Sequence, residues 1–422
     1  MTTAALTMNR PHSCPMREAA AELRTEAPLE AGDFAQLRRK TMLEGCKWDV
    51  QVGDVTALAP FPLVMKRSVW RQLARQAEKL DAEAVAAEEE ISRRPDLLHR
   101  LGLPRALRKA LAADEPLTPA AGRVVRFDFH LTTEGWRISE GNSDVPGGFS
   151  EASHFTGFMA GHFPHLMPAG DPAAAWCGAL AASAAGGPVA LLSAPGLMED
   201  HQVVAFLAAG LNARGCATHL AKPEQVFWHA GQAHLRTQWY RGPLAAVVRF
   251  YQAEWLPRFA AHPGWQHFFR GGKTPVTNPP LGILSESKRF PLLWNDLATP
   301  LPTWRALLPA ACDPRARPWF DDPGWLLKTA YCNTGEAVCI RHLLTPWPWW
   351  QVKLQARLAP GGWVAQRCFE SVPVPTPLGP RHVCVGIYTV NGKAAGAYAR
   401  LAGKPLIDHT AVDVALLLDP HE

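Results

Sequence analysis

The sequence predicts a mixed α/β (α+β) fold, and three stretches of the chain carry that prediction. Residues 188–220 read as a buried apolar strand, a loop, a helix from near Glu199 and a second strand after Gly215, which is the repeating unit of open α/β sheets. Residues 68–92 repeat apolar side chains at steps of three and four, as one face of an amphipathic helix does. The last third of the chain alternates strand-like runs with Pro/Gly turns, which predicts an antiparallel sheet with few helices.

Composition limits the class of protein. With 422 residues, the chain is long enough for two or three domains. Its net charge of +5 is small for that length and its arginines are scattered, which favours a small anionic ligand over nucleic acid. Nine cysteines without a C-x-x-C pair argue against a zinc site and a disulfide framework and indicate a cytoplasmic protein. No apolar run approaches the length that spans a bilayer, which argues against a membrane partner.

Polar side chains alternate along a predicted hairpin, RFDFHLTTEGWRISEGN, which begins at Arg126. Strand alternation puts Arg126 and Asp128 on one face. The length of the turn then decides what Asp128 faces: a two- or four-residue loop places it opposite Ser139, and a three-residue loop places it opposite Glu140. We expect the three-residue loop 133–135, because its third residue is glycine and that position must be left-handed.

In this register Asp128 faces Glu140 and Arg126 faces Asn142. Two carboxylates directly across a sheet repel each other unless a cation lies between them. Two carboxylates and an amide oxygen are ligands that Mg²⁺ prefers, and the neighbouring arginine would meet the anion that the metal orients. The alternative is a solvated polar face over a Phe-lined core, and the hairpin alone favours neither. The loop SDVPGG that follows could bring backbone amides close to a ligand.

Four further residues indicate a nucleotide site. Lys288 lies in SESKRF and Lys328 ends an apolar strand, although each lysine taken singly reads as a surface charge. The turn Asn333-Thr334-Gly335 has the small residues of a phosphate flap, and Gln366 interrupts an apolar strand, so its amide could meet a base edge. Since the chain contains neither G-x-x-x-x-G-K-[ST] nor G-x-G-x-x-G, a nucleotide would bind between sheets.

The chain resembles the glutathionylspermidine synthase family, in particular its synthetase module, over residues 46–418. The resemblance rests on six segments in this order: RFDF, EGNSDVPGG, SESKRFPLLW, GWLLKTAYCNTGEAV, WVAQRCFE and AGAYARLAGKPLIDH. It implies a circularly permuted ATP-grasp fold with an inserted Rossmann-like pre-ATP-grasp subdomain. We therefore expect four parts: a loosely ordered leader (1–45), a part with the metal-binding hairpin (46–185), the Rossmann-like subdomain (186–275) and a nucleotide-binding antiparallel sheet (276–422).

The resemblance also implies roles for individual residues. Arg126 would hold the reacting carboxylate or the transferred phosphate, and Lys288 and Lys328 would contact the phosphates and base of ATP. Arg400 matches an arginine that the family carries on a mobile loop near the transferred phosphate, so we expect its loop to be mobile without ligand. The implied Mg²⁺ ligands are Asp128, Glu140 and Asn142.

These roles imply an ADP-forming ligase that uses ATP and Mg²⁺ to join a small-molecule or peptide carboxylate to an amine through an acyl phosphate. The family's loop is D-T-P-T-S-like where this chain has SDVPGG, so the substrates stay open, as does the oligomeric state. One alternative is a catalytically silent nucleotide-binding scaffold or regulatory subunit, and another is a protein that contacts RNA. For a ligase, Glu140→Gln should cost turnover without harming folding, because it relieves the repulsion with Asp128.

Overall fold

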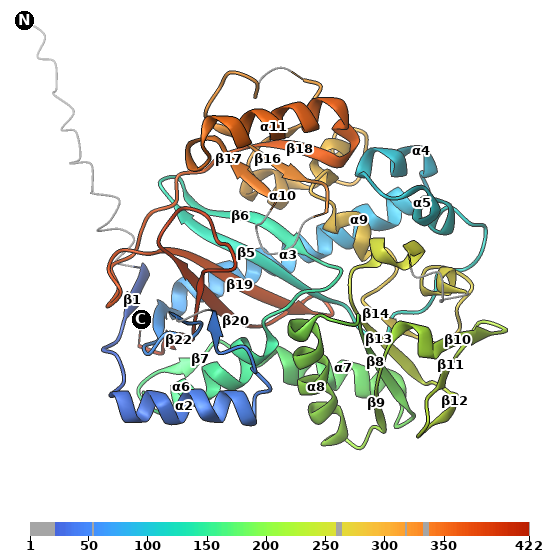
Figure 1. Ribbon diagram of the computed structural model, residues 1–422, viewed down its shortest axis with the longest axis horizontal. Coiled ribbons are helices and arrows are strands. Elements are labelled where there is room, and N and C mark those ends of the chain that lie inside the picture. The colour runs from blue at the N-terminus through green and yellow to red at the C-terminus, as the bar shows by residue number, and fades with distance from the viewer. Residues whose placement is uncertain (1–21, 53–54, 259–263, 317–318, 332–336, 422) are drawn as a thin grey trace, which may run out of the picture.

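A computed structural model describes residues 22–52, 55–258, 264–316, 319–331 and 337–421. It shows a mixed α/β protein in which the described strands form several separate sheets (Figure 1). The predicted fold class is confirmed at this level. Within the described residues, no helix is both long enough and apolar enough to cross a membrane.

A five-stranded antiparallel sheet, in the order β21-β20-β19-β5-β6, lies near the centre of the molecule (Figure 1). Every residue of β5 is buried, so this strand is covered on both faces. The sheet brings the predicted hairpin next to strands from the end of the chain. Its strands are β5 (Val124–Thr132), β6 (Gly135–Asn142), β19 (His382–Val390), β20 (Lys393–Ala402) and β21 (Val412–Val414).

The long helix α3 (Arg67–Ser92) packs against β19 and β20 of this sheet. The apolar stripe read from the sequence is the face that it buries, which confirms the predicted helix. A stripe of this width covers one face of a sheet. Two acids of the helix, Asp81 and Glu88, are buried as well and pair with Arg123. The buried members of the stripe are Leu73, Ala77, Leu80, Ala84 and Ile91.

A parallel sheet in the order β14-β13-β8-β9 forms the second unit, with α7 and α8 beside it (Figure 1). The succession of β8, α8 and β9 confirms the predicted β-loop-α-β unit. A small, separate antiparallel sheet of β10, β11 and β12 follows β9 in the chain. The bounds are α7 (Pro172–Ala184), β8 (Val189–Ser193), α8 (Met198–Asn212), β9 (Thr218–Ala221), β10 (Val226–His229), β11 (Gln232–Arg236), β12 (Arg241–Pro243), β13 (Ala246–Phe250) and β14 (Val276–Thr277).

A third, antiparallel sheet in the order β15-β18-β16-β17 has its own small core beneath α11, at the top of Figure 1. It confirms antiparallel pairing in the last third of the chain, but the predicted single sheet is wrong, because β19 from this third pairs in the central sheet. The short helices α9 and α10 precede it in the chain. The bounds are α9 (Gly282–Glu286), α10 (Pro302–Leu307), β15 (Ala311–Cys312), β16 (Trp325–Thr329), β17 (Val338–Ile340), α11 (Pro346–Leu358) and β18 (Trp363–Arg367).

The two ends of the described chain meet in a sheet of order β1-β4-β22-β7. Residues 22–45, which we expected to be loosely ordered, instead contain β1 and the helix α2. The remaining bounds are β1 (Leu23–Thr25), α2 (Ala31–Leu43), β2 (Gln51–Val52), β3 (Val55–Thr56), β4 (Leu63–Lys66), α4 (Pro95–Leu98), α5 (Arg105–Leu111), α6 (Thr156–Ala160), β7 (Met167–Pro168) and β22 (Leu416–Asp419).

Candidate active site

The hairpin of β5 and β6 pairs Asp128 with Glu140 and Arg126 with Asn142. Both predicted pairs are confirmed. Asn142 is the last residue of β6, so the four side chains lie where the hairpin meets the segment that follows it. The arrangement places two carboxylates, a guanidinium and an amide next to one another on neighbouring strands.

The turn that we predicted for this hairpin is wrong, although the pairing is right. The loop consists of residues 133–134 only, and such a two-residue loop by itself would place Asp128 opposite Ser139. A β-bulge at Ser139 instead shifts the register by one residue, so that Asp128 meets Glu140. The register that builds the site is therefore set by a bulge inside the strand and not by the turn.

The bulge has a second effect, because it leaves Ser139 outside the regular ladder. The carbonyl oxygen of Ser139 accepts a hydrogen bond from Nζ of Lys328, 3.1 Å away and 189 residues later in the chain. The Ser139 hydroxyl lies 3.1 Å from Nε2 of His130. One irregular residue thus connects the hairpin to β16, the strand that carries Lys328.

Asp128 is almost completely buried, with 1 % of its surface exposed, and two guanidinium groups contact it. Arg126 donates from Nε to Oδ1 at 2.7 Å and from Nη2 to Oδ2 at 2.9 Å, and Arg400 donates from Nη2 to Oδ2 at 2.9 Å. Burial alone would raise the pKa of Asp128, but the two arginines outweigh burial and lower the pKa to about 2. Gly386 on β19 makes room for this cluster, since a β-carbon there would lie 2.9 Å from Cδ of Arg126.

The position of Arg400 corrects an expectation. The residue lies inside β20, where its backbone pairs with Cys384 of β19 on one side and with Asp413 of β21 on the other. The expected mobile loop is therefore wrong, because the ladders on both sides hold the backbone and Asp128 holds the side chain. Arg400 nonetheless reaches the predicted site, through the sheet and not through a lid.

The carboxylate of Glu140 contacts a cation of its own, the ammonium of Lys288. Its Oε2 lies 3.3 Å from Nζ of Lys288, and the same ammonium lies 3.3 Å from Oε1 of Glu286. Burial acts to raise the pKa of Glu140, but Lys288, Lys328 and Arg126 outweigh burial and the repulsion from Asp128, so the pKa is lowered. Each of the two facing carboxylates thus has its own cationic partners.

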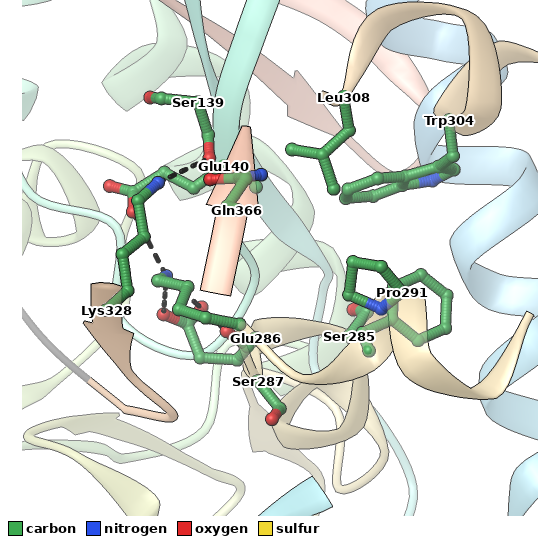
Figure 2. Close-up of a pocket in the computed structure, with 13 residues that line it drawn as sticks. Ser139, Glu140, Ser285, Glu286, Ser287, Pro291, Trp304, Leu308, Lys328 and Gln366 are labelled. Atoms are coloured by element: carbon green, nitrogen blue, oxygen red, sulfur yellow. Dashed lines mark hydrogen bonds and ion pairs between the residues drawn. The ribbon is translucent and has the colours of Figure 1, made fainter. Parts of the chain in front are cut away.

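These side chains line a small pocket between the central sheet and the sheet of β15–β18. Figure 2 shows Lys328, Glu140 and Glu286 on one side of it and an apolar wall of Trp304, Leu308 and Pro291 on the other. A mixed wall of this kind suits a ligand with a charged end and an apolar or aromatic end. Four predicted site residues line the pocket together: Glu140, Lys288, Lys328 and Gln366.

The remaining predicted residues are placed as follows. Asp128, Arg126 and Asn142 adjoin Glu140 through the hairpin but are not part of the pocket lining. Gln366 is buried in β18, opposite Leu326 of β16. The turn Asn333-Thr334-Gly335, and with it the expected phosphate contact of Gly335, lies outside the residues that the structure describes.

The hairpin has the donor types of a magnesium site. The amide nitrogen of Asn142 lies 3.5 Å from Oδ2 of Asp128, and Glu140 faces Asp128 in the sheet. The carboxylate oxygens of Asp128 and Glu140 and the amide oxygen of Asn142 are donors that fit a hard cation. To bind one, Asp128 must give up part of its contact with a guanidinium, and Asn142, whose amide nitrogen faces Asp128, must turn its oxygen to the cation. In the part of the chain that the structure describes, no three His, Cys, Asp or Glu side chains form a ready-made metal cluster.

Two functional candidates were missed in the sequence. Glu286 stands two residues before Lys288 in SESK, and an acid so close to a lysine in the sequence suggests a solvated surface pair. In the structure Glu286 is instead buried, with only 8 % of its surface exposed. Its only signal was its place inside a motif that carried the family resemblance. Ser139 had no signal, because a bulge is not visible in a strand's alternation.

Comparison with known proteins identifies the family of this chain. Residues 62–418 match the family model described as glutathionylspermidine synthase preATP-grasp. The chain belongs to the glutathionylspermidine synthase family. That family assignment confirms the predicted resemblance and covers every residue of the candidate site. No curated protein matches the chain.

Solved structures show the fold of this family member. A glutathione synthetase-like effector from Globodera pallida superposes with a TM-score of 0.62 at 12% sequence identity, covering 92% of this chain and 96% of its own. A putative gamma-glutamylcysteine synthetase from Methylobacillus flagellatus gives a TM-score of 0.40 at 11% identity, over 76% of this chain and 85% of its own. The first of these likenesses identifies the fold as glutathione synthetase-like.

Proposed function

We propose that this member of the family is an ADP-forming, ATP-dependent ligase that joins a carboxylate to an amine. One observation carries the proposal: the facing pair Asp128 and Glu140 adjoins the same pocket to which Lys288 and Lys328 come from distant segments. A ligase of this type needs metal ligands and phosphate-binding cations together, because its chemistry depends on positioning and charge neutralisation.

The charges of the site suit a phosphate-bearing substrate. Four cationic side chains surround three carboxylates, so the cluster keeps an excess of positive charge for an anion. Lys328 and Lys288 reach the pocket and would meet the phosphates, and Gln366 would offer its amide to the base. The cations are Arg126, Arg400, Lys288 and Lys328, and the carboxylates are Asp128, Glu140 and Glu286.

Asp128, Glu140 and Asn142 would hold Mg²⁺, which in such sites neutralises the charge of the phosphates. The role of Arg126 is then to orient Asp128, since its Nε and Nη2 both bind that carboxylate and its Nη1 donates to the carbonyl of Gly147, 3.0 Å away. Arg400 is the guanidinium with a partly exposed side chain, 19% by area, and so is the better placed of the two to meet the transferred phosphate.

The reaction balances in two displacements. A carboxylate oxygen of the first substrate attacks the γ-phosphorus of ATP, the bond from that phosphorus to the β–γ bridging oxygen breaks, and ADP leaves. The amine nitrogen of the second substrate then attacks the acyl carbon, the acyl C–O bond breaks, phosphate leaves, and the nitrogen loses a proton. The lysines and Arg400 stabilise the negative charge that shifts between the phosphate oxygens.

We further propose that the fold is a circularly permuted ATP-grasp. In this chain the hairpin with the proposed metal ligands precedes both lysines that would bind phosphate. The strands of the parallel sheet, β8, β9, β13 and β14, lie in the sequence after the hairpin and before the two lysines. The parts would be 46–185, 186–275 and 276–422. The substrates would be a small-molecule or peptide carboxylate and an amine.

Calorimetry and product analysis test the function. The protein should bind ATP with Mg²⁺ present, and incubation with ATP, Mg²⁺ and pools of amino acids, peptides and polyamines should release ADP and phosphate together with a product heavier than either substrate. Absence of ATP binding under these conditions would remove the ligase proposal. Phosphate release without a condensed product would show an ATPase and not a ligase.

One observation favours a second function. Both oxygens of Asp128 already accept hydrogen bonds from guanidinium groups, so a nucleotide could bind while Asp128 stays unavailable to a metal. The protein would then be a nucleotide-binding scaffold or regulatory subunit. ATP binding that is indifferent to Mg²⁺ and is never followed by ADP release would identify this alternative.

A further inference from the structure

The buried carboxylate of Glu286 connects two parts of the candidate site. Its Oε2 accepts hydrogen bonds from the backbone N–H of Ser143 at 2.6 Å and from that of Asp144 at 3.1 Å. Ser143 follows directly after Asn142, the last residue of the hairpin. Glu286 therefore fixes the backbone immediately beyond the proposed metal ligands.

The other oxygen of Glu286 serves a different group. Oε1 lies 3.3 Å from Nζ of Lys288, and this ammonium lies at the same distance from Oε2 of Glu140. In Figure 2, dashed lines mark the contacts at Glu286, which lies beside Lys328. Among the described residues, Lys288 thus contacts two carboxylates, one from a proposed metal ligand and one from Glu286, which is not a proposed ligand.

The helix that carries Glu286 is seated tightly on the same segment. The hydroxyl of Ser143 donates to the carbonyl of Gly282 at 2.8 Å, and a β-carbon on Gly282 would lie 2.6 Å from the carbonyl oxygen of Ser143. The backbone N–H of Lys288 donates to the carbonyl of Ala330 at 2.8 Å. The backbone around Glu286 is thereby held from both sides, so the carboxylate is a rigid partner for Lys288.

The surroundings of this carboxylate disfavour its charged form. Burial raises the pKa of Glu286, Lys288 counteracts part of that effect, and Asp144 and Glu140 add to the rise. A group whose surroundings disfavour its charged form reduces the stability of the fold at neutral pH. Buried charges of this kind concentrate at functional sites.

We propose that Glu286 is a positioning residue that holds Lys288 against the nucleotide phosphates when Glu140 turns to the metal ion. The inference rests on the proposed function and adds to it a residue that touches neither the metal nor the nucleotide. If Glu140 were the only partner of Lys288, metal binding at Glu140 would release the ammonium. Glu286 prevents this, because it is anchored to the backbone of Ser143 and Asp144 and its second oxygen stays with Lys288.

Glu286→Gln isolates the charge from the backbone contacts. The amide oxygen of glutamine can still accept from Ser143 and Asp144, while the negative charge toward Lys288 is lost. The matched control is Glu90→Gln, because Glu90 also accepts two backbone N–H groups, those of Ala298 at 2.8 Å and Thr299 at 2.7 Å, and is not part of the pocket lining.

The test compares ligands with and without phosphates. Calorimetry should show the Kd of Glu286→Gln for ATP with Mg²⁺ rising about tenfold or more, the scale of a lost charge-assisted hydrogen bond. Ligand-detected NMR should show adenosine binding unchanged, because adenosine has no phosphate for Lys288 to hold. The urea midpoint should equal or exceed that of the parent, and Glu90→Gln should leave both affinities unchanged.

Three outcomes would overturn the inference. Parent-like ATP affinity in Glu286→Gln would show that the charge of Glu286 is not needed to hold Lys288. An equal loss of ATP and adenosine binding in Glu286→Gln would show a merely structural role. The same conclusion would follow if the urea midpoint of Glu286→Gln fell and Glu90→Gln lost as much ATP affinity. Failure of the parent itself to bind ATP would instead reject the proposed function, on which the inference depends.

Discussion

Asp144 and Arg249 form a buried ion pair that joins the loop after the site hairpin to the parallel sheet. Nη1 of Arg249 lies 3.3 Å from Oδ2 of Asp144, its Nη2 contacts Oδ1, and the backbone N–H of Ala253 donates to Oδ2 at 2.8 Å. Only 3 % of Asp144 and 5 % of Arg249 are exposed. The loop SDVPGG is therefore anchored through its aspartate, and its first two N–H groups bind Glu286 and not a ligand.

Asp144→Ala should destabilise the protein strongly. The substitution leaves the Arg249 charge buried without its partner, which costs about 3–5 kcal/mol in comparable buried pairs. Urea unfolding followed by circular dichroism measures the loss. Asp322→Ala is the matched control, because its partner Arg367 is 49% exposed and an exposed pair contributes at most about 1 kcal/mol. Equal losses in the two variants would contradict the structural role of Asp144.

Arg400→Gln should abolish most turnover while leaving the protein folded. Asp128 keeps Arg126 as a bidentate partner, so the buried carboxylate stays paired. Loss of one preorganised cation from a transferred phosphate costs about a hundredfold in rate, on the order of 3 kcal/mol. A coupled ADP assay measures the loss of turnover, and a thermal melt checks that the variant is folded. Arg367→Gln, in strand β18 of a different sheet, should keep parent activity.

Glu140→Gln should also reduce turnover by about a hundredfold, since it removes a proposed metal ligand. Its effect on folding differs from the expectation based on sequence. The lysines lower the pKa of Glu140, so its charged form stabilises the fold above the ordinary carboxyl pKa and that stability is lost on acidification. The variant should be less stable than the parent in urea at neutral pH, and the difference should shrink toward about pH 4. If Glu140→Gln were more stable than the parent at neutral pH, the repulsion between Glu140 and Asp128 would outweigh the attraction of the lysines.

Asp413 should make stability fall with rising pH. Burial raises its pKa to about 7, against the opposing effect of Lys47, and Glu151 adds to the rise. A carboxyl group with a raised pKa contributes stability that is complete below its ordinary pKa and is lost as the pH passes through the raised value. Thermal midpoints of the parent should drop from about pH 4 to about pH 7 and level off above that, and Asp413→Asn should flatten the drop. Parallel profiles for the two proteins would reject this source of pH dependence.

Local rules were enough to predict the elements of this fold and the pairing of the hairpin. The apolar repeat of α3 and the alternation of β5 depend on the geometry of a single helix or strand, so they can be read from neighbouring residues. The same alternation placed Arg126 and Asp128 on one face. Even there the predicted mechanism was wrong, because the bulge at Ser139 produced the register that we had assigned to the turn.

The sequence by itself therefore determined the helix α3, the unit of β8, α8 and β9 and the hairpin strands, which hairpin side chains are neighbours, and to which family the chain belongs. Only the tertiary structure decided that Arg400 lies in a strand beside Asp128, that Lys328 meets the carbonyl of Ser139, and that Glu286 is buried against Lys288. The contacts of Arg400 and Lys328 join residues 272 and 189 positions apart. The periodicity of a sequence reflects the geometry of a single helix or strand. Burial and ion pairing at the site depend instead on how separate sheets pack against one another. For this reason the contacts of Arg400, Lys328 and Glu286 could not be predicted from the sequence.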